Sequence, residues 1–349
     1  MRTRSKGFAL LLAFLLAASA CGGGDDDAGV GAGENSSGAT TTAAGAGSDE
    51  PAESVSFQLA MGSPGLSGTL IQEALVRMNE KYGHDGEFVE IADSDLVVQG
   101  AAQGQFQMGS SSTASVMKVI QNGAPLKFIG ELARNQWTLQ AKAGIESCAD
   151  IDGKRLGLHS PGGVSTALYR AWYKRNCDGE KPDELYIEGS PNRFQALLAD
   201  QVDVSMIEVE DAIDLPEDGY TMLANFSKEL SDIKVGLIYA NQDFIDEHPD
   251  VVEAFMTELT AVQQEVNDDP AFFEELARTY EPDIGEKTAA AVEAYIEGGL
   301  IPDDGGFTEK DVESSIALYV EAGTLDGPSP PGEMMDRSFL EKALENLSS

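Results

Sequence analysis

The sequence contains residues suited to binding a small molecule but no recognisable catalytic set. It has no nucleophile elbow, no phosphate-binding loop and no Ser-His-Asp order. Its three histidines, His84, His159 and His248, are scattered and adjoin no spaced carboxylate or cysteine ligands. We therefore predict no metal site and no cofactor. The chemistry to be expected is reversible binding and not catalysis.

The most informative stretch is residues 156–172, which read LGLHSPGGVSTALYRAW. A short apolar run predicts a buried strand, the Ser-Pro-Gly-Gly sequence predicts a turn, and Val164, Leu168 and Trp172 form the apolar stripe of a helix. Such an arrangement points free backbone N–H groups and the positive end of a helix dipole at one place, which suits an anionic or carbonyl-bearing ligand. We predict ligand contact from six residues here: His159, Ser160, Gly162, Gly163, Val164 and Ser165.

An earlier segment repeats this pattern. Residues 61–71, MGSPGLSGTLI, carry Ser63, Pro64 and Gly65 at an offset of 97 positions from the matching Ser-Pro-Gly of the later stretch. Residues 104–109 and 200–205 form a second matching pair, at an offset of 96 positions. Two matches in the same order predict two similar lobes, each presenting a loop and a helix N-terminus to a cleft. Ser63, Pro64 and Gly65 are therefore further candidates for ligand binding.

Two other places could contribute to the same cleft. Ser111, Ser112 and Thr113 open a predicted helix and could contact a ligand, although helix capping alone would explain them. Trp137 could stack on a planar ligand at the hinge side of the cleft, or pack in the core.

Charged side chains at predicted strand ends bear on the kind of ligand. Glu208, Glu210 and Asp211 stand at a strand end and a helix start, where the helix dipole alone would stabilise them. If Glu208 points into the cleft, it favours a ligand that offers N–H groups, such as an aminopyrimidine or a zwitterion, over a bare inorganic anion. Arg134 and Arg193 could pair with a carboxylate or sulfonate, although surface ion pairs are the commoner fate of arginines.

These residues are positioned by strands that alternate with helices over residues 55–132 and again over 156–224, which is typical of doubly wound sheets. Residues 235–240 predict a strand returning to the first lobe, and the chain beyond is mostly helical. We predict an α/β fold of two lobes, each a doubly wound, mainly parallel sheet, with two crossing strands as the hinge. Lobe 1 comprises residues 54–136 with 241–349, and lobe 2 comprises residues 137–240.

The N-terminus predicts export and anchoring. Three basic residues precede an apolar run, and small residues stand just before Cys21, a pattern similar to a bacterial lipobox. Residues 1–20 are therefore a predicted lipoprotein signal peptide, with Cys21 as the lipid-bearing residue. Residues 21–53 are rich in Gly, Ala, Ser, Thr and Asp, which predicts a disordered tether.

The charge of the chain bears on which partners it could bind, and its cysteines bear on the compartment in which it folds. Lys and Arg number 23 against 60 Asp and Glu, a formal net charge of −37, so nucleic acid is a poor candidate partner. Cys148 and Cys177 could close a disulfide over the first strand and helix of the second lobe in an oxidising compartment.

Two segments resemble a known family. Residues 151–157, IDGKRLG, and residues 193–204, RFQALLADQVDV, are similar to segments of the substrate-binding lipoproteins of ABC importers, in the group that handles nitrate, sulfonates, taurine and thiamine-precursor pyrimidines. The resemblance covers roughly residues 55–266. It implies a type 2 periplasmic-binding-protein fold that closes over one small solute. It matches positions 63–65, 110–113, 160–166 and 208 to loops that line the cleft.

The resemblance also implies partners and a location. The protein would be a monomer, lipid-anchored on the extracytoplasmic face of the membrane, that delivers its solute to ABC permease subunits with a cytoplasmic ATPase. A cysteine-rich motif of the pyrimidine-synthesising relatives is absent from this sequence, which argues against catalysis. Two alternatives stay open: a lipoprotein ligand sensor without a permease, and an enzyme on the same scaffold acting on a small aromatic acid.

Overall fold

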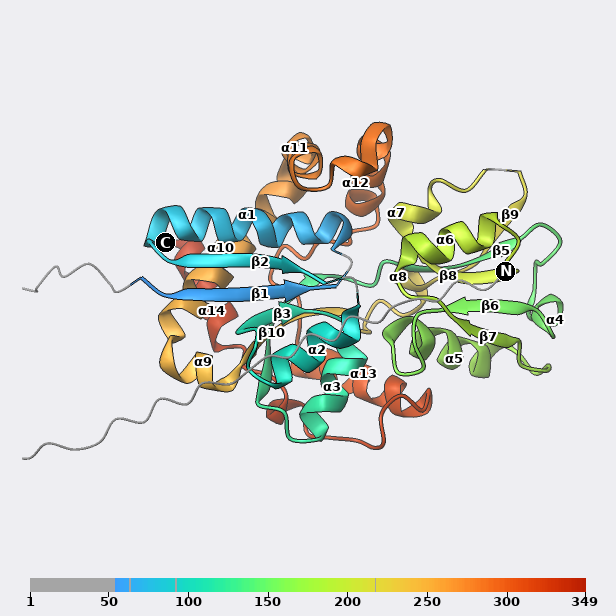
Figure 1. The fold of residues 1–349 in the computed structure, drawn as a ribbon, viewed down its shortest axis with the longest axis horizontal. Coiled ribbons are helices and arrows are strands. Elements are labelled where there is room, and N and C mark those ends of the chain that lie inside the picture. Colours follow the sequence, from blue (N-terminus) through green and yellow to red (C-terminus); the bar gives the residue numbers. More distant parts are fainter. Residues whose placement is uncertain (1–53, 63, 92, 217) are drawn as a thin grey trace, which may run out of the picture. The chain divides into compact units, whose positions relative to one another are not determined.

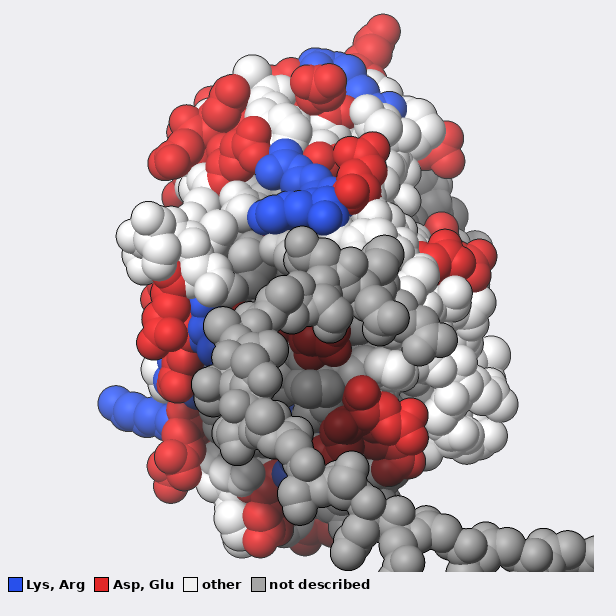
Figure 2. Space-filling view, turned by 90° about the vertical axis from the view of Figure 1, so that its left-hand side faces the viewer, with Lys and Arg blue, Asp and Glu red and all other residues white. Residues whose placement is uncertain are grey.

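The computed structural model describes residues 54–62, 64–91, 93–216 and 218–349. The predicted signal peptide, Cys21, the tether of residues 21–53 and Ser63 lie outside the described residues. Within them, no helix combines the length and the apolar character that crossing a membrane requires. Acidic side chains are scattered over the face shown in Figure 2, where Lys and Arg form smaller groups.

Within the described residues, the first sheet has five strands in the order β2-β1-β3-β10-β4. Figure 1 shows β2, β1 and β3 side by side. Strand β1 runs parallel to β2 and β3, whereas β10 is antiparallel to both of its neighbours, so four strands share one direction. Phe57 and Leu59 alternate with more exposed residues in β1, and both are buried in the core. The strands are β1 (Ser56–Met61), β2 (Asp85–Glu90), β3 (Met108–Ser110), β4 (Leu126–Ala133) and β10 (Gly236–Asn241).

Helices of the first lobe come from both ends of the described chain. The long helix α10 packs against α1 and α14 and buries an apolar stripe that includes Val252, Phe255 and Leu259. The helices are α1 (Gly65–Tyr82), α2 (Ser94–Ala102), α3 (Thr113–Gln121), α9 (Gln242–Glu247), α10 (Pro249–Asp268), α11 (Pro270–Tyr280), η1 (Pro282–Lys287), α12 (Thr288–Glu297), α13 (Glu309–Glu321), η2 (Pro331–Glu333) and α14 (Ser338–Ser348).

The second sheet has the order β7-β6-β8-β5-β9. Strand β6 is parallel to β7 and β8, and β5 is antiparallel to β8 and β9, so this sheet repeats the plan of the first. Its strands are β5 (Trp137–Lys142), β6 (Arg155–Leu158), β7 (Asp183–Tyr186), β8 (Val204–Glu208) and β9 (Tyr220–Asn225). Its helices are α4 (Cys148–Ile151), α5 (Val164–Asn176), α6 (Ser190–Leu198), α7 (Val209–Ala212) and α8 (Phe226–Glu229). The α/β fold with two mainly parallel sheets is thus as predicted.

Among the described residues, the chain passes between the two sheets at two places. Residues 134–136 link β4 to β5, and residues 226–235, which include α8, link β9 to β10. Our boundary at residue 240 left residues 236–240 in the second lobe, whereas β10 pairs with β3 and β4 of the first sheet.

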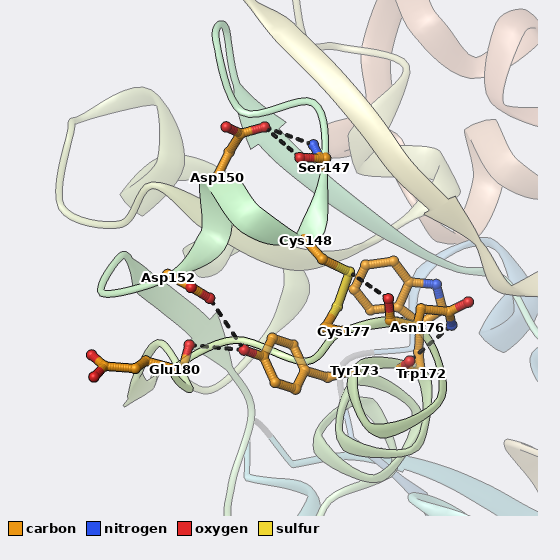
Figure 3. Close-up of a disulfide and its surroundings, with 9 residues drawn as sticks. All are labelled: Ser147, Cys148, Asp150, Asp152, Trp172, Tyr173, Asn176, Cys177 and Glu180. Atoms are coloured by element: carbon orange, nitrogen blue, oxygen red, sulfur yellow. Dashed lines mark hydrogen bonds between the residues drawn. A yellow bond between two sulfur atoms is a disulfide. The ribbon is translucent and has the colours of Figure 1, made fainter.

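A disulfide joins Cys148 of α4 to Cys177 at the end of α5 (Figure 3). Their Cα atoms lie 5.3 Å apart, and the two residues are 29 positions apart in the chain. Nearby, the Tyr173 hydroxyl donates a 2.8 Å hydrogen bond to the Glu180 carbonyl oxygen. The disulfide and this hydrogen bond hold the segment that follows α5 against the second lobe.

Candidate functional site

A cavity of about 90 Å³ lies where the carboxyl ends of β1 and β3 meet those of β6 and β8. Ligands of open α/β sheets sit at this edge, because strand ends and helix N-termini converge there. Residues of both lobes line the cavity: Ser94, Ser110 and Ser112 belong to the first sheet and its helices, and His159 and Arg193 to the second. We call this space the inner cavity.

Eight of the predicted binding residues line the inner cavity. They are Pro64, Ser111, Ser112, Trp137, His159, Val164, Ser165 and Glu208. Whether each contacts a ligand stays a prediction, but the fold brings together residues that are up to 144 positions apart in the sequence.

Five other predicted residues do not line it. Thr113 is fully buried, and its hydroxyl accepts a hydrogen bond from the Leu237 backbone N–H. The Ser160 carbonyl accepts a 2.7 Å hydrogen bond from the Thr166 hydroxyl, so this turn closes on its own helix. Gly162, Gly163 and Gly65 are also absent from the inner cavity wall.

The N-terminus of α5 is hydrogen-bonded to a residue of the first lobe. The Val164 backbone N–H donates a 3.1 Å hydrogen bond to the Ser112 hydroxyl oxygen. A free helix N-terminus was the basis for predicting ligand contact from this loop. In the structure that N–H group instead joins the two lobes beside the cavity.

Arg193 of α6 is the main positive group of the inner cavity. Its side chain is buried, with 1% of the residue exposed, and it lies over the ring of Trp137 at 5.2 Å. Its Nε donates to the Met206 carbonyl oxygen at 2.7 Å and its Nη1 to the Ile187 carbonyl oxygen at 2.9 Å. Burial lowers the pKa of Arg193 to about 10, against the opposing effect of nearby Glu208, so the guanidinium stays charged at neutral pH.

Glu208 and Glu210 supply carboxylates to the same wall. Burial, reinforced by the negative charges of Glu210 and Asp211, raises the pKa of Glu208 well above its ordinary value. Burial also raises the pKa of Glu210 to about 7. Glu208 makes no capping hydrogen bond to the short helix α7. The wall of the inner cavity thus combines the cation Arg193 with the carboxyl groups of Glu208 and Glu210.

Two buried polar atoms at the inner cavity have no hydrogen-bond partner among the described residues. They are Oε1 of Gln136 and Nε2 of His159. Burial, with a smaller contribution from Arg193, lowers the pKa of His159, so its imidazole is neutral at pH 7. Buried polar atoms normally have partners, so these two are available to a ligand.

Several lining residues were missed from the sequence. Ser94 and Ser190 begin helices that follow strands, so a search for helix starts at every strand end would have found them. Tyr295 lies in α12, 85 positions after the Glu210 with which it hydrogen-bonds. Nothing local in the sequence marks Tyr295 as a cavity residue.

A second cavity, of about 510 Å³, adjoins the first and shares Pro64, Glu208 and Glu210 with it. We call it the acidic cavity. Among the residues that the structure describes, its wall carries one cation, Lys287, which forms an ion pair with Asp214. Seven carboxylates of the described residues line it: Glu90, Glu208, Glu210, Asp211, Asp214, Glu281 and Asp283.

Burial, together with the charges of Glu90 and Asp283, raises the pKa of Glu281 in the acidic cavity to about 7. Even so, within residues 54–62, 64–91, 93–216 and 218–349 no group of three or more His, Cys, Asp or Glu side chains is placed to hold a metal ion. The described carboxylates of the acidic cavity are therefore not arranged as a metal site.

The sequence matches the family model described as NMT1/THI5 like over residues 80–271, more than half of the chain. A comparison with curated protein sequences finds no significant match. Several solved structures have the same fold. The alkanesulfonate-binding protein SsuA from Xanthomonas axonopodis pv. citri, bound to MOPS, aligns with a TM-score of 0.67 and 18% identity over 82% of this chain and 100% of that one.

Two further structures agree. The periplasmic nitrate-binding protein NrtA from Synechocystis PCC 6803 has a TM-score of 0.67 and 11% identity, covering 84% of this chain and 89% of that one. A ligand-binding component of an ABC-type import system from Staphylococcus aureus has a TM-score of 0.70 and 12% identity, covering 83% and 99%. These likenesses establish the periplasmic-binding-protein fold, and the match over residues 80–271 shows that the chain belongs to the NMT1/THI5-like family.

Proposed function

We propose that the protein is the extracytoplasmic solute-binding lipoprotein of an ABC importer, which captures a small organic solute between its two lobes. The observation that carries this proposal is the inner cavity. It is lined from the strand ends of both sheets and holds a buried arginine, carboxylates and polar atoms without partners. Such a combination is typical of a binding site for a small polar molecule.

The structural neighbours support the transport role. Two of them are named for binding an alkanesulfonate or nitrate, and a third as the ligand-binding component of an ABC-type import system. The lipobox-like sequence before Cys21 supports export and anchoring. We propose that a permease with its cytoplasmic ATPase receives the solute and that the protein acts as a monomer.

The mechanism would be closure of one lobe on the other. A solute that contacts both lobes favours the state in which they approach, and that state is the one a permease would recognise. We propose residues 54–136 with 236–349 as one moving body and residues 137–235 as the other, with β10 assigned to the first. Hydrogen bonds from Val164 to Ser112 and from Tyr295 to Glu210 join the two bodies here.

Solute binding can be tested with the purified full-length protein, unfolded and refolded to remove any carried solute. Its melting temperature would be measured with nitrate, taurine, alkanesulfonates, aminopyrimidines, nucleobases and amino acids. A solute at about 100 times its Kd adds about 2.7 kcal/mol to the free energy of unfolding, which gives a clear shift. The shift should disappear in Arg193→Met. A protein that carries no solute through native purification and responds to no compound would contradict the proposal.

The lipid anchor has its own test. In bacterial cells fed an alkyne-labelled fatty acid, the protein should acquire the label and fractionate with the membrane. Cys21→Ala should abolish both, whereas Cys148→Ala with Cys177→Ala should leave both intact. Labelling of the Cys21→Ala variant would show that the anchor is elsewhere.

A further inference from the structure

The two adjoining cavities differ in the charged side chains that line them. The inner cavity contains the buried cation Arg193 and hydroxyl groups of several serines, whereas the acidic cavity is lined by seven carboxylates and a single lysine among the described residues. The cavities meet at Glu208 and Glu210, which line both. A solute that occupies both spaces would therefore meet a positive end and a negative end.

The inner end is built to accept an electron-rich group. Backbone carbonyls hold the Nε and Nη1 atoms of Arg193, while Nη2 has no hydrogen-bond partner among the described residues. Arg193 is 1% exposed and its guanidinium lies over the Trp137 ring, so its orientation is set before a ligand arrives. A carboxylate or another anionic oxygen group would satisfy Nη2 with a charge-assisted hydrogen bond.

The acidic end lacks counter-charge. Asp214 pairs with Lys287, but Glu90, Glu208, Glu210, Asp211, Glu281 and Asp283 form no ion pair within the described residues. Oδ2 of Asp211 is buried and also without a hydrogen-bond partner there. The raised pKa values of Glu210 and Glu281, both about 7, reflect the cost of holding these charges out of water. A cationic group in this space would remove that cost.

We propose that the solute is amphoteric, with an anionic head held by Arg193 in the inner cavity and a protonated amine that reaches the carboxylates of the acidic cavity. This inference rests on the proposed solute-binding function. A simple anion would satisfy Nη2 of Arg193 but leave the carboxylates of the acidic cavity without a counter-charge. A simple cation would leave Nη2 of Arg193 without a hydrogen-bond partner.

The test compares ω-amino acids with matched compounds that lack one charge. Isothermal titration of the refolded full-length protein would measure 3-aminopropanoate, 4-aminobutyrate and 6-aminohexanoate, each against the alkanoate and the alkylamine of the same carbon count. We expect at least one amino acid to bind about tenfold or more tighter than both of its matched compounds, since each charge-assisted contact contributes that much.

Variants locate the two ends of the solute. Glu281→Gln should weaken binding of the amino acid several-fold and leave the alkanoate unchanged, because only the amine reaches the acidic cavity. Glu208→Gln should weaken the amino acid more strongly, since this carboxylate lines both cavities. Glu341→Gln, a matched charge removal on the exposed face of α14, should change neither. Circular dichroism of each free variant would confirm that it is folded.

Three results would overturn the inference. If an alkanoate or an alkanesulfonate bound as tightly as every amino acid, and Glu281→Gln changed nothing, the solute would be an organic anion and the proposed function would stand. If no ω-amino acid bound while an aminopyrimidine or nucleobase did, the amphoteric class would be wrong and solute binding would again stand. Failure of every compound, with no solute carried through purification, would remove both proposals together.

Discussion

The carboxylate of Glu210 accepts a 2.7 Å hydrogen bond from the hydroxyl of Tyr295. Glu210 belongs to α7 beside the second sheet, and Tyr295 to α12, which follows the helices of the first lobe. The same carboxylate also accepts a 3.3 Å hydrogen bond from the Leu66 backbone N–H at the start of α1. One side chain of the second lobe thus contacts two elements of the first, beside both cavities.

Removing the Tyr295 hydroxyl should weaken the association of the lobes. Hydrogen bonds to charged groups contribute about 1.5 to 3 kcal/mol, so Tyr295→Phe should lower the population of the associated state about tenfold or more. Small-angle scattering of the solute-free protein should then give a larger radius of gyration than that of the wild type.

Tyr280→Phe is a matched control for this experiment. The Tyr280 hydroxyl also donates to a carboxylate, Glu73 at 3.0 Å, but both residues lie in the first lobe. Its loss should leave the radius of gyration unchanged. An equal effect from the two variants would mean that the Tyr295 hydroxyl has no special role between the lobes.

The free energy of unfolding should depend on pH through Glu210. Burial raises its folded-state pKa from 4.5 to about 7, so the folded state holds the proton more tightly than the unfolded state. The resulting stabilisation is fully present below about pH 4.5 and is lost as pH rises through about 7. Urea unfolding between pH 5 and 8 should show a steeper decline for the wild type than for Glu210→Gln.

Other carboxyl groups also contribute to the pH dependence of the free energy of unfolding. The pKa of Glu281 is also raised to about 7 by burial, so Glu210→Gln should reduce the decline and not abolish it. The pKa of Asp203 is lowered, mainly by its hydrogen bonds from Arg155, and its contribution is lost only in strong acid. If the free energy of unfolding of Glu210→Gln declined between pH 5 and 8 as steeply as that of the wild type, Glu210 would not be a source of the pH dependence.

A buried ion pair next to a lobe connection should be costly to break. Lys234 Nζ lies 3.0 Å from Glu131 Oε2, and the two side chains are 6% and 0% exposed. Lys234→Met would leave the Glu131 charge buried and unpaired, which costs about 3 to 5 kcal/mol. Urea unfolding at pH 8 should show this loss, and adding Glu131→Gln should restore most of it.

The loss should be smaller at pH 5 than at pH 8. Burial raises the pKa of Glu131 to about 7 even with Lys234 present, so acid would neutralise the unpaired carboxylate. A Lys234→Met variant that lost the same free energy at both pH values would show that packing, and not charge, accounts for the effect.

The disulfide should stabilise the second lobe. Closing a loop between residues 29 positions apart removes chain entropy from the unfolded state worth about 3 to 4 kcal/mol. Thermal unfolding with dithiothreitol should therefore lower the melting temperature of the wild type. The Cys148→Ala, Cys177→Ala variant should begin at that lower value and show no further response to the reductant.

Local patterns determined much of the fold. The alternation of Phe57 and Leu59 defines β1, and the apolar stripe of Val164, Leu168 and Trp172 defines α5, because these residues face the core at the strand and helix periods. The repeat at an offset of 97 positions corresponds to two sheets of the same plan. The return of the chain into the first sheet was also visible in the sequence, although β10 lies before our boundary at residue 240 and not after it.

The candidate site was only partly predictable from the sequence. Residues at strand ends, such as Ser112, His159 and Glu208, could be predicted, because a sheet places all of its carboxyl ends at one edge. Gly162 and Gly163 were predicted on local geometry, yet the neighbouring Val164 N–H is taken by Ser112 from the other lobe. Tyr295, the buried position of Arg193 and the acidic cavity depend on elements that are distant in the chain. Periodicity and turn chemistry act over a few residues, whereas contacts between lobes are decided by how whole elements pack, and so only the tertiary structure could place them.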